Sequence, residues 1–251
     1  MRANFETLVY EAEQAHFSGW DFSYLKDRLV EEEPPWDYRQ MVLDRLPGAQ
    51  SLLDMGTGGG EFLAALPGLP AITCATEAWE PNLAVARRRL EPLGVRVEFL
   101  SNEEQLPFDN QSFGLVINRH ESVVPAELHR ILQPDGIFIT QQVGGKDNLQ
   151  LNDFLAPQIH YPYADWDMAC MAGQLEAAGL TLLEQQESFP TYRFLDIGAI
   201  VYYLKVIEWQ IPGFNTQTYR ERLLALHEKI QTEGAFITTS HRFSVIARKN
   251  L

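Results

Sequence analysis

The sequence predicts an α/β protein built on a doubly wound, mostly parallel sheet with helices on both faces. From residue 51 onward, short apolar segments alternate with segments of helical pattern, an order typical of parallel sheets. The apolar segments are continuous runs, which suit strands that are buried on both faces. The chain has 251 residues, 45% hydrophobic and 22% charged, so it is long and apolar enough to bury a large core.

The predicted elements follow one another in a regular order. The first strand, Ser51–Asp54, leads through a glycine-rich turn into a helix at Glu61–Leu66. The helix Pro81–Leu90 has proline in its first turn and Gly94 beyond its end, the usual arrangement of these residues at helix ends. The remaining strands are predicted at Ala71–Glu77, Val95–Leu100, Phe113–Asn118, Gly136–Val143, Thr181–Ser188 and Arg242–Arg248, the last of them antiparallel, and the remaining helices at Ala126–Leu132 and Asp165–Gly179.

Two parts of the chain lie outside this alternation and are expected to form a substrate lid. Residues 1–46 have a helical, acidic pattern that prolines at 34 and 35 interrupt. Residues 47–251 form the predicted main domain, with lid inserts at about 144–170 and 196–234. We expect the first insert to be a polar, aromatic excursion over the sheet edge and the second to be helical. Most aromatic residues of these segments are expected to pack against the core.

Charge and composition exclude several classes of partner. The formal charge of −14 at pH 7 makes nucleic acid an unfavourable partner, because phosphates require a positive surface. Cys74 and Cys170 lack zinc-binding spacing, so no metal is expected. The N-terminus lacks a signal-peptide pattern, and no apolar run approaches the roughly 18 residues that cross a bilayer. We therefore expect a cytoplasmic protein with no membrane partner, either a monomer or a homodimer.

The segment Leu52–Phe62, LLDMGTGGGEF, has four glycines in five residues and predicts a ligand-binding loop. The dinucleotide fingerprint needs a third glycine where this chain has Glu61, and no Gly-Lys-Ser/Thr follows for a phosphate-binding P-loop. An acid at the start of a helix also opposes an anionic ligand there. The loop therefore suits close backbone approach to a ligand that is not strongly anionic.

Two acids indicate the chemistry of that ligand. Asp54 precedes the glycines and suits a cationic group, whereas Glu77 ends the second strand, where a carboxylate can accept hydrogen bonds from both ribose hydroxyls. These residues indicate a ligand that has a ribose and a positive charge and that does not depend on a phosphate group for binding. S-adenosylmethionine meets these three conditions.

Three segments resemble the successive motifs of class I S-adenosylmethionine-dependent methyltransferases, in particular the group that modifies small molecules. They are LLDMGTGGGE, LPFDNQSFGLVINRH and ELHRILQPDGIFI, and the resemblance extends over roughly residues 48–143. It implies a Rossmann-like fold. Gly114 replaces an aspartate that is common in the family, a departure that bears on packing.

The resemblance also implies roles for individual residues. Asp54, Gly56, Thr57 and Gly58 correspond to the loop that holds the methionine part of the cofactor, and Glu77 to the acid that binds the ribose. Asn102 stands where the family usually has aspartate, and its side chain can still accept a hydrogen bond from the adenine amino group. The other cofactor-binding positions implied are Ala78 and Trp79 beside the adenine, Glu103 at the adenine edge, and Asn118 and Arg119 at the end of the fourth strand.

The sequence also suggests how the methyl group is transferred. A sulfonium methyl is already activated, so alignment of the acceptor is the main requirement and a general base is optional. His120, with Glu121 beside it, is the candidate base. The expected acceptor is O or N of a small molecule.

Other functions stay open at this stage. They are RNA or protein methylation, a cofactor-binding module without turnover, and, least favoured, an NAD-dependent oxidoreductase. The segment after the fourth strand, NRHE, lacks the Asn/Asp-Pro-Pro-aromatic motif of adenine N6-methylating enzymes, and neither cysteine has the Pro-Cys arrangement of cytosine C5-methylating enzymes.

Overall fold

The computed structural model describes residues 2–17, 21–102, 104–159, 161 and 163–250, and it divides into two compact units. The sheet unit comprises Pro35–Gly144, Asp165–Ser188 and Arg242–Leu251. The helical unit comprises Met1–Pro34, Gly145–Ala164 and Phe189–His241. Each unit therefore draws on three separate segments of the chain.

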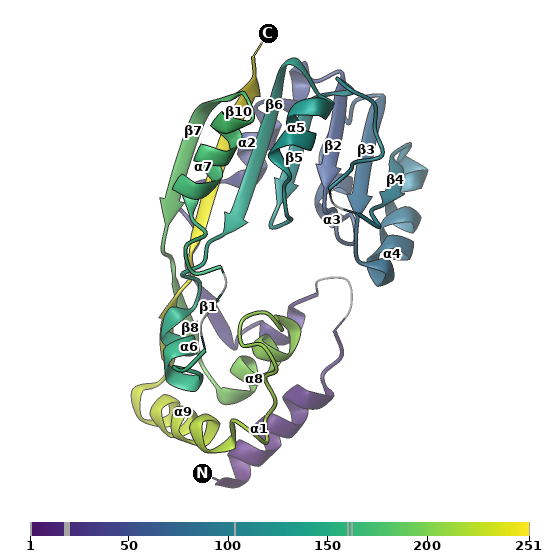
Figure 1. Ribbon diagram of the computed structural model, residues 1–251. Coiled ribbons are helices and arrows are strands. Elements are labelled where there is room, and N and C mark those ends of the chain that lie inside the picture. The colour runs from purple at the N-terminus through teal and green to yellow at the C-terminus, as the bar shows by residue number, and fades with distance from the viewer. Residues whose placement is uncertain (1, 18–20, 103, 160, 162, 251) are drawn as a thin grey trace. The chain divides into compact units, whose positions relative to one another are not determined.

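The sheet unit contains a seven-stranded sheet with the order β4-β3-β2-β5-β6-β10-β7 (Figure 1). Strands β2 to β6 pair in parallel, and β10 lies antiparallel to both β6 and β7. The predicted doubly wound, mostly parallel sheet with an antiparallel last strand is therefore confirmed. The strands are β2 (Ser51–Met55), β3 (Ile72–Glu77), β4 (Arg96–Phe99), β5 (Phe113–Arg119), β6 (Leu132–Val143), β7 (Leu180–Ser188) and β10 (Arg242–Lys249).

Alternation along the strands builds a separate core on each face of the sheet. Leu52 and Leu115 belong to the cluster that α2 (Tyr38–Leu43) and α4 (Glu80–Leu90) cover. Their neighbours Leu53 and Val116 belong to the opposite cluster, covered by α5 (Pro125–Ile131) and α7 (Met168–Ala177). Figure 1 shows α5 and α7 in front of the sheet and α2 behind it. Because side chains of a strand alternate between faces, a one-residue shift would move both sets to the wrong core.

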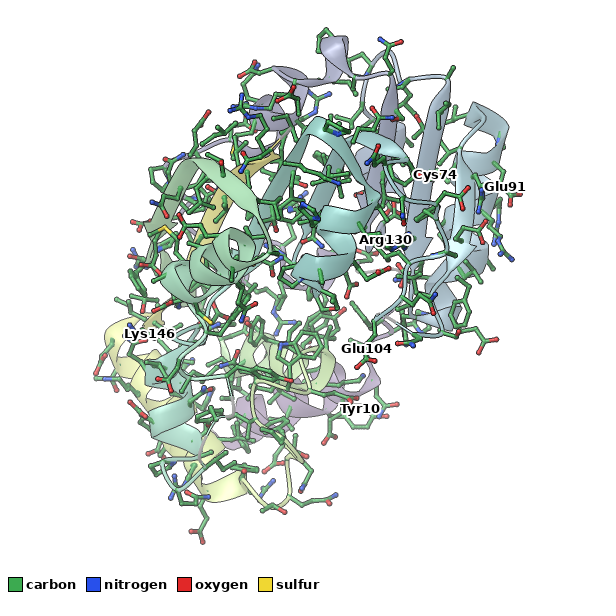
Figure 2. All side chains as sticks on the ribbon, turned by 45° about the horizontal axis from the view of Figure 1, so that its top comes forward. Tyr10, Cys74, Glu91, Glu104, Arg130 and Lys146 are labelled. Carbon is green, nitrogen blue, oxygen red and sulfur yellow. The ribbon has the colours of Figure 1, made fainter. Side chains whose placement is uncertain are left out.

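Arg130 on α5 fixes the loop between β4 and β5 (Figure 2). Its guanidinium donates to the carbonyl oxygens of Phe108 at 2.7 Å and Leu106 at 3.0 Å, and it pairs with Glu127 at 2.7 Å. The Glu127 carboxylate also accepts the backbone N–H of Leu106 at 2.9 Å. These bonds hold the loop on which Asn102 and Glu104 lie.

The helical unit has four helices and a small antiparallel sheet of order β1-β8-β9 among its described residues. The helices are α1 (Arg2–Gln14), α6 (Leu149–Leu155), α8 (Ile197–Val206) and α9 (Arg220–Glu233); the strands are β1 (Leu29–Glu31), β8 (Thr191–Phe194) and β9 (Phe236–Thr239). The remaining elements of the described chain are α3 (Glu61–Ala64) and the 3₁₀ turns Ser23–Leu25, Leu46–Gly48 and Glu91–Leu93.

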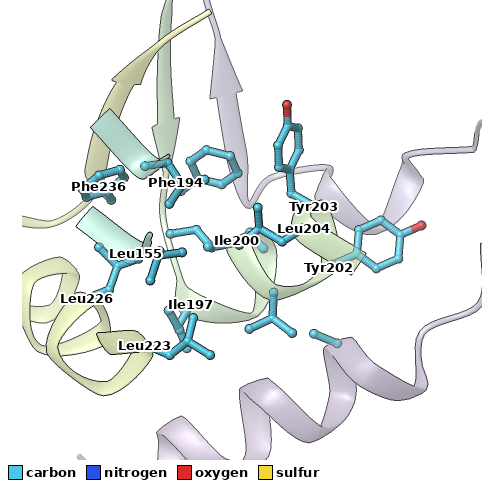
Figure 3. Packing of buried hydrophobic residues seen from close by; sticks show 14 of the residues in the cluster. Leu155, Phe194, Ile197, Ile200, Tyr202, Tyr203, Leu204, Leu223, Leu226 and Phe236 are labelled. Carbon is cyan, nitrogen blue, oxygen red and sulfur yellow. The ribbon is translucent and has the colours of Figure 1, made fainter. Parts of the chain in front are cut away.

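Helix α8 is the centre of the helical unit (Figure 3). Nine of its ten residues are buried, and Lys205 is the exposed one. Ile197 and Ile200 pack with Leu223 of α9 and Phe194 of β8 in one cluster. A helix that is apolar around its whole circumference must be surrounded by protein, and α1, α9 and the small sheet provide that surrounding.

Two expectations about the lid segments change. Residues 1–46 are not one helical piece, because β1 interrupts them and α2 belongs to the sheet unit. The stretch from Gly144 to Tyr163 contains α6, and residues 145–164 belong to the helical unit instead of forming an irregular excursion from the sheet. None of the described helices is long and apolar enough to cross a bilayer.

Candidate functional site

The glycine loop between β2 and α3 needs glycine at two positions, for its backbone conformation and for close packing. Gly56 and Gly58 have φ values of 67° and 60°, which non-glycine residues rarely adopt. A Cβ at Gly56 would lie 2.6 Å from side-chain atoms of Glu121. The N–H of Thr57 donates to the carbonyl of Thr76 on β3 at 2.9 Å, which ties the loop to the neighbouring strand.

The side chain of Asp54 is buried next to this loop. Its carboxyl is 5% exposed and accepts the Thr57 hydroxyl at 2.7 Å. Burial raises the pKa of Asp54 to about 7; the bond from Thr57 lowers that pKa and the charge of Glu77 raises it further. A cation beside Asp54 would favour its ionised form.

Glu77 lies at the carboxyl end of β3 and is 4% exposed. Burial raises its pKa, the N–H of Trp79 opposes that rise by donating to the carboxylate at 2.7 Å, and the charge of Glu121 adds to it. Ala78 is half-buried, and Trp79 lies on the surface.

Three carboxyl groups therefore come together around one loop. Glu121 lies against Gly56, Glu77 is influenced by Glu121, and Asp54 is influenced by Glu77. No group of acids, histidines or cysteines in the described chain has the arrangement of a metal site. Burial of carboxyl groups is unfavourable unless a positive charge lies beside them or they are protonated.

The structure gives a different account of Glu61 and of the missing third glycine. Glu61 is paired with Arg89 of α4, which offsets its charge, so Glu61 is a weaker barrier to phosphate than the sequence suggests. Gly60 has φ of 79°, and a Cβ there would lie 2.7 Å from Leu90 of α4. Gly60 thus provides close packing of the loop against a helix, one position before the fingerprint glycine.

The predicted adenine-edge residues lie on the exposed loop after β4. The Asn102 side-chain oxygen accepts the N–H of Glu104 at 2.9 Å. An amide oxygen has two lone pairs, so this bond leaves one for a ligand. Glu103 lies outside the described residues.

Asn118 is fully buried at the carboxyl end of β5 and presents a donor rather than an acceptor. Its side-chain oxygen accepts from Thr140 at 3.0 Å and from Gln142 at 2.7 Å, which uses both lone pairs. Its side-chain nitrogen has no hydrogen-bond partner in the described structure. Its main-chain oxygen accepts the Tyr38 hydroxyl at 3.0 Å.

Arg119 and Tyr38 lie together beside Asn118. The guanidinium of Arg119 lies 5.9 Å from the centre of the Tyr38 ring. The Tyr38 pKa lies well above its ordinary value because the hydroxyl is buried and Asp54 is near. Tyr38 is the first residue of α2, so this short helix contributes directly to the site.

His120 follows β5 in a left-handed conformation with φ of 63°. Its N–H donates to the carbonyl of Gln141 at 2.8 Å, and its Nε2 lies 3.2 Å from the Gln141 amide nitrogen. His120 is an exposed residue, yet its pKa is well below the ordinary value, because of desolvation of the ring and then the positive charges of Arg242 and Arg119.

Sequence reasoning missed four residues of this site. Tyr38, Gln141 and Gln142 were not predicted as site residues. Trp36, whose indole N–H donates to the Gln141 side chain at 2.8 Å, was expected only in the lid. One signal was present in the sequence: the polar run Thr140–Gln142 directly follows the apolar residues Ile137–Ile139 of β6, at the end of the strand where ligands bind in such sheets. Nothing in the sequence indicated Tyr38, which reaches the site through tertiary packing.

Comparison with known proteins agrees with this geometry. The model of the methyltransferase domain family matches residues 53–140. The release factor glutamine methyltransferase of Geobacter sulfurreducens is 29% identical over 161 residues, 62% of this chain and 56% of the relative. The chain thus spans little more than half the length of this curated relative.

Solved structures show the same fold. A candidate methyltransferase from Bacillus halodurans has a TM-score of 0.62 at 18% identity, covering 86% of this chain and 99% of its own. The YcgJ protein of Bacillus subtilis has a TM-score of 0.58 at 16% identity, covering 85% and 98%. Residues 53–140 thus match the methyltransferase domain family, and the strand order and the glycine loop make this chain similar to class I S-adenosylmethionine-dependent methyltransferases.

Proposed function

We propose that this protein transfers a methyl group from S-adenosylmethionine to O or N of a small-molecule acceptor. The observation that carries the proposal is the cluster of Asp54, Glu77 and Glu121 around Gly56 and Gly58. Such a cluster suits a ligand that carries positive charge and hydroxyl groups. S-adenosylmethionine has a sulfonium, an ammonium and a ribose.

The residues present fit this cofactor. Glycines at 56 and 58 would let the methionine part approach the backbone closely, since neither position carries a side chain. Glu77 would accept hydrogen bonds from the ribose, and Asp54 would balance positive charge. The unpartnered side-chain nitrogen of Asn118 would donate to the cofactor, while Ala78, Trp79 and Asn102 would surround the adenine.

The cofactor, when bound, supplies an activated methyl group, and the chain's own task is to orient the acceptor and exclude water. Positioning of this kind contributes about 7–11 kcal/mol in favourable cases. His120 and Glu121 follow β5 at the carboxyl edge of the sheet, where an acceptor would lie. A proton acceptor is an optional addition there.

A protein side chain is the second candidate acceptor, because the Geobacter relative is named for glutamine methylation. The side-chain amide nitrogen of a glutamine acceptor carries two hydrogens, so the enzyme would need a free oxygen to accept a hydrogen bond from it. Both the side-chain and main-chain oxygens of Asn118 already accept hydrogen bonds within the protein, from Thr140, Gln142 and Tyr38. This arrangement favours an acceptor other than an amide or an exocyclic amine of RNA.

Cofactor binding tests the first part of the proposal. Wild-type protein should bind S-adenosylmethionine with micromolar affinity in isothermal titration calorimetry. Glu77→Ala and Gly58→Val should each abolish measurable binding. Matched controls are Glu80→Ala, an exposed acid three residues further on, and Gly48→Val, where a Cβ meets nothing within 4 Å. Undiminished binding in both site variants would contradict the proposal.

Turnover tests the second part. Protein with methyl-labelled cofactor is incubated with a metabolite extract, and separately with RNA and protein fractions. Label in small molecules supports the proposal, and label confined to RNA or protein overturns the choice of acceptor. Cofactor binding without transfer in any fraction indicates a binding module instead.

A further inference from the structure

Four polar side chains share one face of the sheet beyond the cofactor loop. Arg119 of β5 is in register with Gln141 of β6, and Gln141 is in register with Ser244 of β10. Arg242 lies two residues before Ser244, so its side chain leaves β10 on the same face. This is the face on which α2 packs.

A chain of hydrogen bonds on this face fixes the proton of His120. The indole N–H of Trp36 donates to the side-chain oxygen of Gln141 at 2.8 Å, so the other end of that amide is its NH₂ group. This NH₂ lies 3.2 Å from Nε2 of His120. An amide NH₂ only donates, so Nε2 must accept, and the proton of the neutral ring is on Nδ1.

The arrangement leaves His120 as a donor. Nδ1 has no hydrogen-bond partner in the described part of the chain, and the ring reaches the surface. Desolvation, and then the charges of Arg242 and Arg119, lower the pKa of the ring, which favours its neutral form. The left-handed backbone and the bond from the His120 N–H to Gln141 hold the ring in place.

We infer that His120 Nδ1–H, Arg119 and Arg242 form a subsite for an anionic oxygen group of the methyl acceptor, a carboxylate or a phenolate. Trp36 and Gln141 are positioning residues for it. The inference rests on the proposed function, and it makes His120 a hydrogen-bond donor rather than the general base. Acids thus surround the cofactor loop, whereas cations lie at the ends of β5 and β10.

The proton position can be measured without cofactor or substrate. In protein labelled with ¹⁵N at histidine, the His120 resonances, assigned by their loss in His120→Gln, should report protonated Nδ1 and unprotonated Nε2. Gln141→Leu should move the population toward protonated Nε2. Gln133→Leu, at the other end of β6, is the control and should leave the signals unchanged. Protonated Nε2 in the wild type overturns the inference.

Anion binding is tested with benzoate and its uncharged isostere benzamide, with and without S-adenosylhomocysteine. Benzoate should bind saturably, shift the His120 resonances and bind at least about tenfold more tightly than benzamide. Arg242→Gln should weaken benzoate binding about tenfold, Arg242→Lys should weaken it less, and Arg248→Gln, on the same strand, should not change it.

Equal binding of the two probes, or no saturable benzoate binding, overturns the subsite. Thermal unfolding confirms that each variant is folded. Loss of S-adenosylmethionine binding would defeat the proposed function instead, so the two failures are distinguishable.

Discussion

The protonation state of the buried residue Asp54 affects both the stability of the fold and the binding of a cationic ligand. Its carboxyl lies inside the sheet unit and accepts a hydrogen bond from the Thr57 hydroxyl, and its pKa is about 7. Near neutral pH the group is therefore partly protonated in the folded chain. A cationic ligand would shift it to the ionised form and release a proton.

This residue makes the stability of the protein depend on pH. The pKa is raised above the unfolded value of 3.8, so the folded state holds a proton that the unfolded state has lost. Stability therefore falls as pH rises from about 4 to about 7, by about 1.4 kcal/mol for each unit of the shift. Asp54→Asn removes this effect, so its stability relative to wild type should increase between pH 5 and pH 8.

Urea unfolding at the two pH values measures this difference. Asp44→Asn provides the reference for the same substitution at an exposed position. A stability difference between Asp54→Asn and wild type that is the same at both pH values would show that Asp54 ionises normally.

At the scale of elements, the N-cap of the short helix α2 helps to hold a side chain of the site in place. Asp37 is its N-cap, and its carboxylate accepts the N–H of Gln40 at 3.1 Å. The helix has six residues and places Tyr38 beside Asn118, directly after Trp36. A helix this short has little stability of its own, so the cap matters more than in a long helix.

Removing the cap should loosen this part of the site. Asp37→Ala is expected to cost about 1 kcal/mol of stability and to speed amide exchange in residues 38–43. Asp37→Asn retains a capping oxygen and should stay within a few tenths of a kcal/mol of wild type. Exchange that is equally fast in both variants would mean that tertiary packing, and not the cap, holds the helix.

The elements also show what the sequence could and could not reveal. The strands β2 to β6 were predictable because each has apolar residues at successive or alternate positions and turn residues nearby, and the glycine loop because four glycines in five residues are rare. The strands β1, β8 and β9 have three or four residues each, too few for a period to appear. Their pairing also joins distant segments, as in Leu29 opposite Phe194.

The site, too, has residues that the sequence predicts and residues that only the folded structure brings together. Asp54 and Glu77 were found because they end strands next to turns, where position in the chain fixes position in the fold. The role inferred for His120 depends on Trp36 and Gln141, which lie 105 residues apart and meet only in the folded sheet unit. Sequence could locate His120 and could not assign its proton.

At the scale of the whole molecule, the two units separate cofactor binding from the rest of the chain. Every described residue proposed to hold S-adenosylmethionine belongs to the sheet unit, and the helical unit has its own core. Damage to that second core should therefore reduce stability without an equal loss of cofactor binding.

A pair of core variants tests this separation. Leu223→Ala in the helical unit and Leu115→Ala in the sheet unit each remove a side chain that is at most 1% exposed, at a cost of about 2–5 kcal/mol. Cofactor affinity measured below the unfolding transition should stay within about threefold of wild type for Leu223→Ala and fall by more for Leu115→Ala. Equal losses in the two variants would show that the units act as one in binding.

The helical unit also has a consequence for synthesis on the ribosome. The carbonyl of Glu13, in α1, accepts from Lys205 of α8, 192 residues later. At about 5–20 residues per second, the N-terminal helix waits about 10–40 s for its partner. Throughout that time Phe5 and Val9, both buried in the finished fold, face solvent in the nascent chain. Helix α1 is thus synthesised long before the helix that covers it, so its apolar side chains stay exposed while most of the chain is made.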